Sequence, residues 1–421
     1  MSSKRTCYVF LQLPGALDVV TCGRYEREVL RDGRVVGRFG YAPSYRQRED
    51  AVPLDPYHLP LTPRRYETAK LDGMFGALRD ASPDAWGRHV IDKMTGRADL
   101  DEMDFLLHGP EDRAGALSFG EERAPPVATQ RFNRVLHLRE LRRAARALEE
   151  AAPGEPVGQQ VTDLLEPGTS LGGARPKNVV EDDEGLWIAK FPQRSDKWNN
   201  APVEAAMLAL ARRCAIRTPD TRVEQIGDES VLLVRRFDRA KVPEGYLRHR
   251  MVSALTVLDA DDRVTDRTAW SYVLLADELR RWSERPAADR AELFRRVAFN
   301  ALISNLDDHP RNHALIAPGQ NWHLAPAYDL TPYPAVSLER RDLALECGPY
   351  GRMARRDNLV ATAPRFGFEP GEASAVIDEI KQTVQRHWRD EVRRLGGTAG
   401  DCKVIEPAFV YPGFEYRTDR T

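Results

Sequence analysis

The feature that most constrains this chain is a polar turn at the end of a long apolar segment. Residues 293–304 are apolar at helical spacing, and Asn305-Leu306-Asp307-Asp308-His309-Pro310-Arg311-Asn312 follows directly. A second aspartate, Asp329, comes later in Ala-Pro-Ala-Tyr-Asp-Leu. Phosphoryl transfer from ATP uses one carboxylate to orient and deprotonate the acceptor hydroxyl, and an amide oxygen and a second carboxylate to hold Mg²⁺. The spacing predicts a kinase catalytic loop, with an ordinary helix-ending turn as the alternative.

Length and composition narrow the class of protein. A chain of 421 residues with 42% hydrophobic and 30% charged residues is expected to form two or three soluble globular domains. The net charge of −2 gives no global attraction to nucleic acid or to an acidic membrane. No apolar run reaches the roughly 18 residues of a membrane span, and the first residues lack a secretory signal core. Five scattered cysteines favour a reduced, cytoplasmic protein.

A glycine-rich stretch lies upstream, in Gly168-Thr-Ser-Leu-Gly-Gly-Ala-Arg-Pro-Lys177. Small residues let backbone amides approach a phosphate, although the stretch is not a Walker A loop because G-K-[ST] is missing. Strands are predicted on both sides, and Leu186-Trp-Ile-Ala-Lys190-Phe returns after the turn Asp183-Glu-Gly185. A glycine-rich hairpin with a lysine on the returning strand is how kinases cover and hold ATP phosphates. The alternative is an ordinary glycine-rich hairpin.

Two further kinase parts are expected between this hairpin and the polar turn. A helix begins near Asn200, and Glu204 is placed in its first turn, where it either pairs with Lys190 or complements the helix dipole. The apolar strand 231–234 leads into Arg235-Arg236-Phe237, where an adenine would meet backbone groups. The alternative for this link is a strand end with a solvated basic run.

The remaining pattern predicts an α+β chain that begins with strands and ends mainly in helices. Strands are expected at 7–13 and around 29–30 and 35–36, the last two joined by Asp32-Gly33, and Ser82 is expected to cap a helix. A long helix is predicted over 372–394. With a boundary at Pro125-Pro126, the predicted divisions are a β-led domain at 1–125, a kinase N-lobe at 126–240, a helical C-lobe at 241–400, and a tail at 401–421. This tail is expected to be poorly packed apart from its apolar Phe409-Val410-Tyr411.

With these parts in order, the chain resembles the HipA family of toxin–antitoxin serine/threonine kinases. Five segments carry the resemblance: Ser170-Leu-Gly-Gly-Ala-Arg-Pro-Lys177, Ala189-Lys-Phe-Pro192, Arg236-Phe-Asp-Arg239, Asp307-Asp-His-Pro-Arg-Asn312 and Tyr328-Asp-Leu330. The N-terminal part is also similar, at Phe39-Gly-Tyr-Ala-Pro43 and Leu78-Arg-Asp-Ala-Ser-Pro-Asp84. The resemblance implies a protein-kinase-like, HipA-like bilobal fold with a β-led N-terminal subdomain.

The resemblance also implies a role for each matching residue. Asp307 would be the catalytic base, Asn312 and Asp329 would bind Mg²⁺, and Ser170 would be autophosphorylated, a modification linked in the family to loss of activity. Two added negative charges in a phosphate-binding loop would repel ATP or eject the loop. The residues implied to contact ATP are Gly172, Gly173, Ala174, Arg175, Pro176, Lys177, Lys190, Arg235, Arg236, Phe237, His309, Asn312, Tyr328 and Asp329.

Departures from the family pattern leave alternatives open. Arg311 stands where the family usually has lysine, which keeps the charge but replaces a point charge with a planar fork. The resemblance implies a separate DNA-binding, HipB-like antitoxin and a protein substrate, with a translation component as the family-level expectation. The chain itself has no predicted DNA-binding domain. Two alternatives are a kinase of a small molecule or lipid headgroup, and a module that holds ATP or a partner repressor without catalysis.

Overall fold

Two units share the chain, and they alternate along the sequence. The computed structural model describes residues 3–97, 99–126, 132–151, 158–165, 173–263, 265–335 and 337–417. Unit 1 comprises Met1–Phe191, Arg235–Val252 and Ile316–Asn321; unit 2 comprises Pro192–Val234, Ser253–Leu315 and Trp322–Thr421. The boundary between units therefore falls after Phe191, inside the stretch predicted as the N-lobe, and each unit is described by itself.

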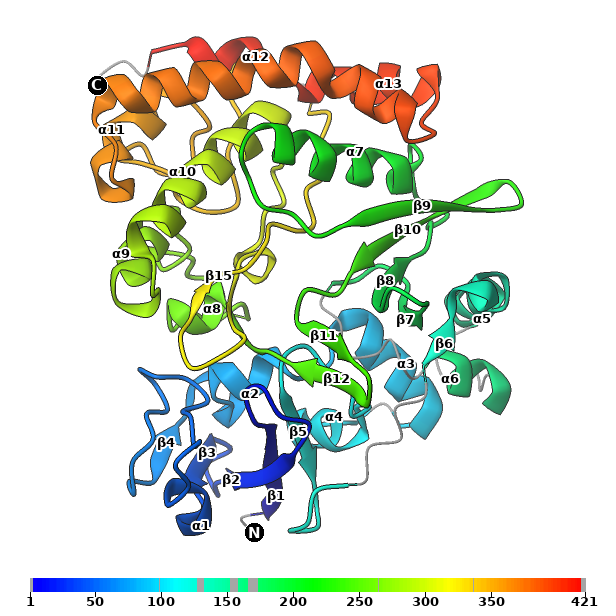
Figure 1. The fold of residues 1–421 in the computed structure, drawn as a ribbon, viewed down its shortest axis with the longest axis vertical. Coiled ribbons are helices and arrows are strands. Elements are labelled where there is room, and N and C mark those ends of the chain that lie inside the picture. Colours follow the sequence, from blue (N-terminus) through cyan, green and yellow to red (C-terminus); the bar gives the residue numbers. More distant parts are fainter. Residues whose placement is uncertain are drawn as a thin grey trace. The chain divides into compact units, whose positions relative to one another are not determined.

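Unit 1 begins with a five-stranded antiparallel sheet in the order β4-β3-β2-β1-β5 (Figure 1). Its strands are β1 (Ser3–Gln12), β2 (Val19–Val29), β3 (Val35–Tyr41), β4 (Tyr66–Thr68) and β5 (Leu117–Gly120). The predicted hairpin is confirmed, since β2 pairs with β3 across a turn in which Gly33 has a φ of 82°. Glycine adopts this left-handed conformation without a steric penalty.

Unit 1 also contains helices, some between the strands of this sheet in the sequence and some after them. They are α1 (Pro43–Arg46), η1 (Lys70–Gly73), α2 (Gly76–Asp80), α3 (Ala85–Thr95), α4 (Glu102–His108), η2 (Val135–His137), α5 (Leu138–Glu150) and α6 (Gln159–Leu165). The prediction that Ser82 caps α3 was wrong: the carboxylate of Asp84 accepts the Gly87 N–H at 2.7 Å. Both residue types favour this position, and here the helix starts two residues later than the sequence suggested.

The other strands of unit 1 include the predicted glycine-loop hairpin. β6 (Asn133–Arg134) runs parallel to β7 (Lys177–Glu181), which pairs antiparallel with β8 (Leu186–Lys190). β11 (Arg239–Val242) and β12 (Gly245–Arg248) form a second hairpin, and β13 (Arg250–Ser253) follows. Asp182 N–H donates to Gly185 O at 3.0 Å, which closes the turn between β7 and β8 as predicted.

Unit 2 is mainly helical. It contains α7 (Asn200–Arg213), the hairpin β9 (Thr221–Ile226) and β10 (Glu229–Arg235), α8 (Ala254–Val257), α9 (Tyr272–Trp282), α10 (Pro286–Ile303), η4 (Pro310–Asn312), β14 (Ala314–Ala317), β15 (His323–Leu324), α11 (Arg356–Phe366), α12 (Pro370–Arg394), α13 (Ala399–Ile405), η5 (Glu406–Ala408) and η6 (Pro412–Glu415). The long helix α12 packs against α7 and α10. Within the described parts of the chain, no helix combines the length and the apolar character needed to cross a bilayer.

The prediction of a tail that is poorly packed apart from Phe409-Val410-Tyr411 was wrong for the described residues 401–417. Thr398 and Asp401 form a capping box at the start of α13, and Cys402, Ile405, Ala408, Tyr411 and Phe414 are buried. The ring of Phe409 stacks on Trp388 of α12 with centroids 4.1 Å apart. Apolar side chains at irregular spacing between prolines gave no periodic signal, yet each packs against unit 2.

Candidate active site

Helix α10 delivers the polar turn. Its apolar residues Leu293, Phe294, Val297 and Leu302 are fully or almost fully buried, which fixes the helix inside unit 2. The last residue of the helix is Ile303, and the C-cap residue Ser304 adopts the left-handed conformation with a φ of 53°. This backbone reversal directs the chain out of the helix axis and into the turn.

Asp307 and Asp308 have opposite surroundings, although they are neighbours in the sequence. Asp307 is exposed, whereas Asp308 is only 1% exposed and accepts hydrogen bonds from Tyr272, Asn300 and His313. A carboxylate whose oxygen is already occupied by three buried donors is unsuited to receive a substrate proton. The geometry therefore supports Asp307 as the candidate base.

Asn312 lies beside Asp307 through the backbone of the turn. The N–H of His309 donates to Asp307 O at 2.8 Å, and the Asn312 N–H donates to His309 O at 2.7 Å. The amide nitrogen of Asn312 is 3.5 Å from the same Asp307 carbonyl. This contact turns the amide nitrogen toward the backbone, which leaves the Asn312 side-chain oxygen for a ligand.

Asp329 reaches the same place from the segment after β15. Although Asp307 is exposed, surrounding protein atoms partly desolvate its carboxyl and raise its pKa, and the negative charges of Asp329 and Asp308 raise it further. The hydroxyl of Tyr328 donates to Arg311 O at 2.6 Å, which ties this segment to the turn. Asp329 has a φ of 60°, a left-handed conformation that is uncommon for a residue with a side chain and that clusters at functional sites.

These oxygens fit a magnesium site of the kinase type. Mg²⁺ is usually held by one or two carboxylates together with substrate phosphates and water, rather than by a cage of protein ligands. In the described part of the chain, no group of three or more His, Cys, Asp or Glu residues is arranged to hold a metal by itself. Asp329 and Asn312 would supply one carboxylate oxygen and one amide oxygen to such an open site.

The histidine of the turn is a structural cap in this arrangement. His309 Nδ1 accepts the Arg311 N–H at 3.1 Å, and its ring packs edge-on against Trp270 with centroids 4.4 Å apart. Burial lowers the pKa of His309 to about 4, and the nearby Arg311 charge lowers it in the same direction. A neutral imidazole is consistent with the acceptor role of Nδ1. The ATP contact predicted for His309 stays a prediction.

The arginine that departs from the family pattern is held by a carboxylate. Nε and Nη2 of Arg311 lie 2.9 and 2.7 Å from Oδ2 of Asp262. Sequence reasoning missed both Asp262 and Arg267. Arg267 is exposed, stacks over Trp270 at 4.5 Å, and its charge opposes the rise in the Asp307 pKa. Neither residue stands in a recognisable motif, because segment 259–269 reads as a loop.

In unit 1, the two candidate lysines lie directly opposite each other. Lys177 at the start of β7 is the cross-strand partner of Lys190 at the end of β8. Directly opposed residues on antiparallel strands share a face of the sheet. Gly173, Ala174 and Arg175 precede β7 and are exposed or half-buried, whereas Ser170 and Gly172 lie outside the described residues.

Lys177 does not project from the loop toward solvent. Its side chain is 2% exposed, and Nζ is 2.8 Å from Oδ2 of Asp84. Trp86 reinforces this contact, because its Nε1–H donates to Lys177 O at 3.1 Å. The ammonium predicted to contact a phosphate is thus engaged in a buried ion pair. Lys190 is half-buried and remains the better candidate for ATP.

The charged residues of segment 236–239 are buried and hydrogen-bonded inside unit 1, so the segment is not a solvated basic run. The Arg236 guanidinium donates to Asp112, to Asp238 and to Arg113 O, and its side chain is fully buried. The Arg235 side chain folds back to Glu184 O at 2.8 Å. The Arg236 guanidinium is buried and engaged, so it is not available to an adenine. The backbone contacts expected of residues 235–237 stay a prediction.

Glu204 lies in unit 2, on α7. It is 6% exposed and is the fifth residue of a helix that begins at Asn200, so its placement in the first turn was wrong. The helix dipole stabilises a carboxylate mainly within the first turn, so it explains little of the position of Glu204. Pairing with Lys190 of unit 1 stays a prediction.

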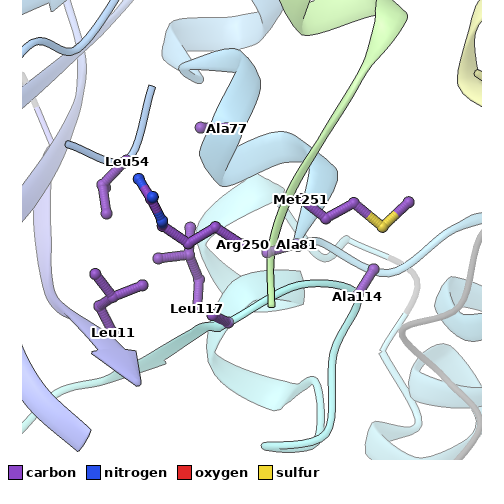
Figure 2. A pocket seen from close by; sticks show the side chains of 9 residues that line it. Leu11, Leu54, Ala77, Ala81, Ala114, Leu117, Arg250 and Met251 are labelled. Carbon is purple, nitrogen blue, oxygen red and sulfur yellow. The ribbon is translucent and has the colours of Figure 1, made fainter. Parts of the chain in front are cut away.

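A small pocket of unit 1 is apolar except for Arg250 (Figure 2). Figure 2 shows this side chain among Leu11, Leu54 and Leu117. Its guanidinium donates to Pro53 O, Gly319 O and Gln320 O, each at 2.8 Å. Arg250 therefore joins two loops of unit 1 and is already engaged, so this pocket gives no candidate ligand site.

Comparison with known families decides the classification. The model of the HipA-like C-terminal domain matches residues 169–388, more than half of the chain, and the model of the HipA N-terminal domain matches residues 17–120. The chain belongs to the HipA family. Its fold is α+β and protein-kinase-like, with a β-led N-terminal part, as predicted.

Individual HipA relatives agree with this assignment. Y4dM of Sinorhizobium fredii and a protein of Haemophilus influenzae, both named as candidate kinases, are 29% and 27% identical over 54% and 49% of this chain. The chain spans 57% and 64% of the length of these two relatives. The HipA of Shewanella oneidensis MR-1, solved with HipB and operator DNA, has a TM-score of 0.69, 17% identity and 94% coverage of both chains.

Proposed function

We propose that this HipA-family chain is a Mg-ATP-dependent serine/threonine protein kinase, and that it is the toxin of a toxin–antitoxin pair. The observation that carries the proposal is the convergence of Asp307, Asn312 and Asp329 at the end of α10, with Asp307 exposed and Asp308 buried. Bound Mg²⁺ would neutralise charge on the transferring phosphate. Asp329 and Asn312 would hold it, and Asp307 would accept the proton of the substrate hydroxyl.

The electrostatics of the turn suit this role. A general base works best when its pKa lies closer to the operating pH than that of an ordinary carboxylate. Partial burial shifts the pKa of Asp307 in that direction, and the charges of Asp329 and Asp308 add to the shift as long as no cation is bound to Asp329. Lys190 would orient the phosphates, and Ser170 would be the autophosphorylated residue.

The partner is proposed from a relative. The HipA of Shewanella oneidensis was solved in a complex with HipB and operator DNA. A HipB-like, DNA-binding antitoxin encoded separately is therefore the proposed partner of this chain, and its substrate is proposed to be a protein. The acidic and basic residues nearly balance over the whole chain, which is consistent with DNA contact being supplied mainly by the partner.

The test is phosphate mapping. The purified chain is incubated with Mg-ATP, and phosphorylated peptides are identified by mass spectrometry. Wild type is expected to carry phosphate on Ser170, whereas Asp307→Asn and Asp329→Asn are expected to carry none. Asparagine tolerates the left-handed conformation of residue 329, so Asp329→Asn should keep the fold.

Asp228→Asn is the matched control, because it removes an exposed carboxylate from the β9–β10 turn of the same unit. It should be phosphorylated like wild type. Absence of both phosphate and ATP hydrolysis in wild type would indicate a binding module instead. Equal growth of cells that produce wild type and cells that produce Asp307→Asn would rule out the proposed role as a toxin.

A further inference from the structure

A buried polar cluster lies next to the candidate catalytic turn in unit 2. Oδ2 of Asp308 accepts hydrogen bonds from the Tyr272 hydroxyl, from Asn300 Nδ2 at 2.7 Å and from His313 Nε2 at 2.6 Å. All four residues are at most 3% exposed. Three buried donors on one oxygen hold the Asp308 carboxylate in one orientation.

The three donors come from different elements around the turn. Tyr272 is the first residue of α9, Asn300 lies in the last part of α10, and His313 follows η4. Asn300 also accepts from Asn305 through its side chain, at 3.2 Å, and through its backbone carbonyl, at 2.8 Å. The cluster therefore fixes three positions of the turn: Asn305 at its start, Asp308 beside Asp307, and His313 at its end.

The histidine also has a defined orientation in this cluster. His313 Nδ1 is buried, and no described residue hydrogen-bonds to it. A ring nitrogen without a proton can remain unpaired more cheaply than a buried N–H donor. The proton is therefore assigned to Nε2, which donates to Asp308. Its ring also meets Tyr272 edge-on, with centroids 5.5 Å apart at 89°.

We propose that Asp308 is a positioning residue of the phosphoryl transfer, which acts by holding Asp307 and Asn312 in place through Tyr272, Asn300 and His313. The proposal rests on the proposed kinase function. Asp308 is buried and held from three sides, whereas its neighbour Asp307 is exposed and lies near the charge of Asp329. A displacement of about 1 Å in a catalytic group can lower a rate about 100-fold. Loosening the cluster should therefore lower kcat much more than it changes KM for ATP.

The chain offers a matched structural control at the other end of α10. Asp289 is also a buried carboxylate, and it accepts the Ser283 hydroxyl at 2.7 Å. Tyr272→Phe and Ser283→Ala each remove one hydroxyl donor from a buried carboxylate of the same unit. If the Asp308 cluster only stabilised the fold, both variants would affect activity equally once corrected for the folded fraction.

The experiment compares kcat, KM for ATP and thermal midpoint for wild type, Tyr272→Phe, Ser283→Ala, His313→Gln and His313→Ala. Tyr272→Phe is expected to lower kcat about tenfold with KM for ATP nearly unchanged, and Ser283→Ala should keep the wild-type kcat. His313→Gln, which retains a donor, should retain more kcat than His313→Ala.

Two outcomes would overturn the proposal: a wild-type kcat in Tyr272→Phe, or an equal loss in Ser283→Ala. Asp308→Asn adds a stronger perturbation, and the hydroxyl and histidine variants keep the test valid if that variant does not fold. If wild type itself transfers no phosphate, the proposed function fails, whereas active wild type with active Tyr272→Phe rejects only the positioning role.

Discussion

Lys177 and Asp84 form a buried ion pair, with Nζ of the lysine 2.8 Å from Oδ2 of the aspartate. Asp84 belongs to the segment matched by the HipA N-terminal domain, and Lys177 belongs to the segment matched by the HipA-like C-terminal domain. Both lie in unit 1. The pair therefore ties the start of β7, just after the glycine-rich stretch, to the N-terminal helix α3.

Removing the charge of Asp84 is expected to destabilise unit 1. Asp84→Asn keeps a good N-cap for α3 but leaves the Lys177 ammonium without its buried counter-charge, so the free energy of unfolding should fall by about 3–5 kcal/mol. Lys177→Met in the same chain should restore part of this loss. Urea unfolding of wild type, both single variants and the double variant measures the coupling.

The control is Asp99→Asn, because Asp99 is an exposed residue paired with Arg97. Its unfolding midpoint should match that of wild type. Additive effects of the two single variants would contradict the coupling. The same variants separate the two lysines: Lys190→Met should raise KM for ATP, whereas Lys177→Met should leave KM for ATP nearly unchanged in the folded protein.

The sequence predicted the elements whose signals are local. Asp32-Gly33 indicated a hairpin because glycine readily takes the left-handed conformation that such turns need, as Gly33 does. The β7–β8 hairpin followed from its flanking apolar strands. The polar turn after α10 was predictable because the apolar helical pattern stops before Asn305 and a run of polar residues with a proline follows. The choice of Asp307 over Asp308 came from spacing, and the buried partners of Asp308 now give it a physical basis.

Long-range partners explain what the sequence could not predict. Arg236 was expected to lie at the adenine site or, as the alternative, in a solvated basic run, but its partner Asp112 lies 124 residues away. Lys177 looked like a phosphate ligand because nothing nearby revealed Asp84. Arg267 gave no signal because a single arginine in a loop is ordinary. In each case the sequence identifies the charge, but only the fold identifies the group that faces it.

The buried Arg236–Asp238 pair predicts a pH-dependent stability. Burial alone would raise the pKa of Asp238, but the Arg236 and Arg239 guanidinium groups outweigh it and hold this pKa well below its ordinary value. A carboxyl with a depressed folded-state pKa stabilises the fold above its unfolded pKa of about 3.9, and this stabilisation is lost as the pH falls below that value. Asp238→Asn should therefore cost about 3–5 kcal/mol at pH 7 and progressively less below pH ~4.

Urea unfolding at several pH values between 3 and 7 measures this difference. Asp50→Asn is the control, since it removes an exposed carboxylate that pairs with Arg48, and its midpoint should stay close to that of wild type throughout. A difference between Asp238→Asn and wild type that stays constant down to pH 3 would show that the carboxylate charge is not the stabilising group.

Arg341 connects the end of α10 to the C-terminal segment 406–416 and is expected to hold the two together. This side chain is 2% exposed and donates to Ser304 Oγ, to Pro407 O at 2.6 Å and to Ala408 O at 3.1 Å. Ser304 Oγ in turn donates to Ala408 O at 2.5 Å. Ser304 directly precedes the turn that carries Asp307. The C-terminal segment therefore stabilises the start of this turn through its hydrogen bonds to Ser304 and Arg341.

Arg341→Met should release this brace while it keeps the apolar stem. The lost hydrogen bonds to a charged donor are each worth about 1.5–3 kcal/mol, so the Val410 N–H, which donates to Leu302 O at 2.7 Å, should exchange with solvent about 10–100-fold faster. Hydrogen exchange of peptides covering 406–416 measures this. Arg340→Met, which removes an exposed arginine paired with Asp342, should leave the exchange unchanged. Equal exchange rates in the two variants would mean that the aromatic contacts alone, such as Trp388 with Phe409, hold the segment.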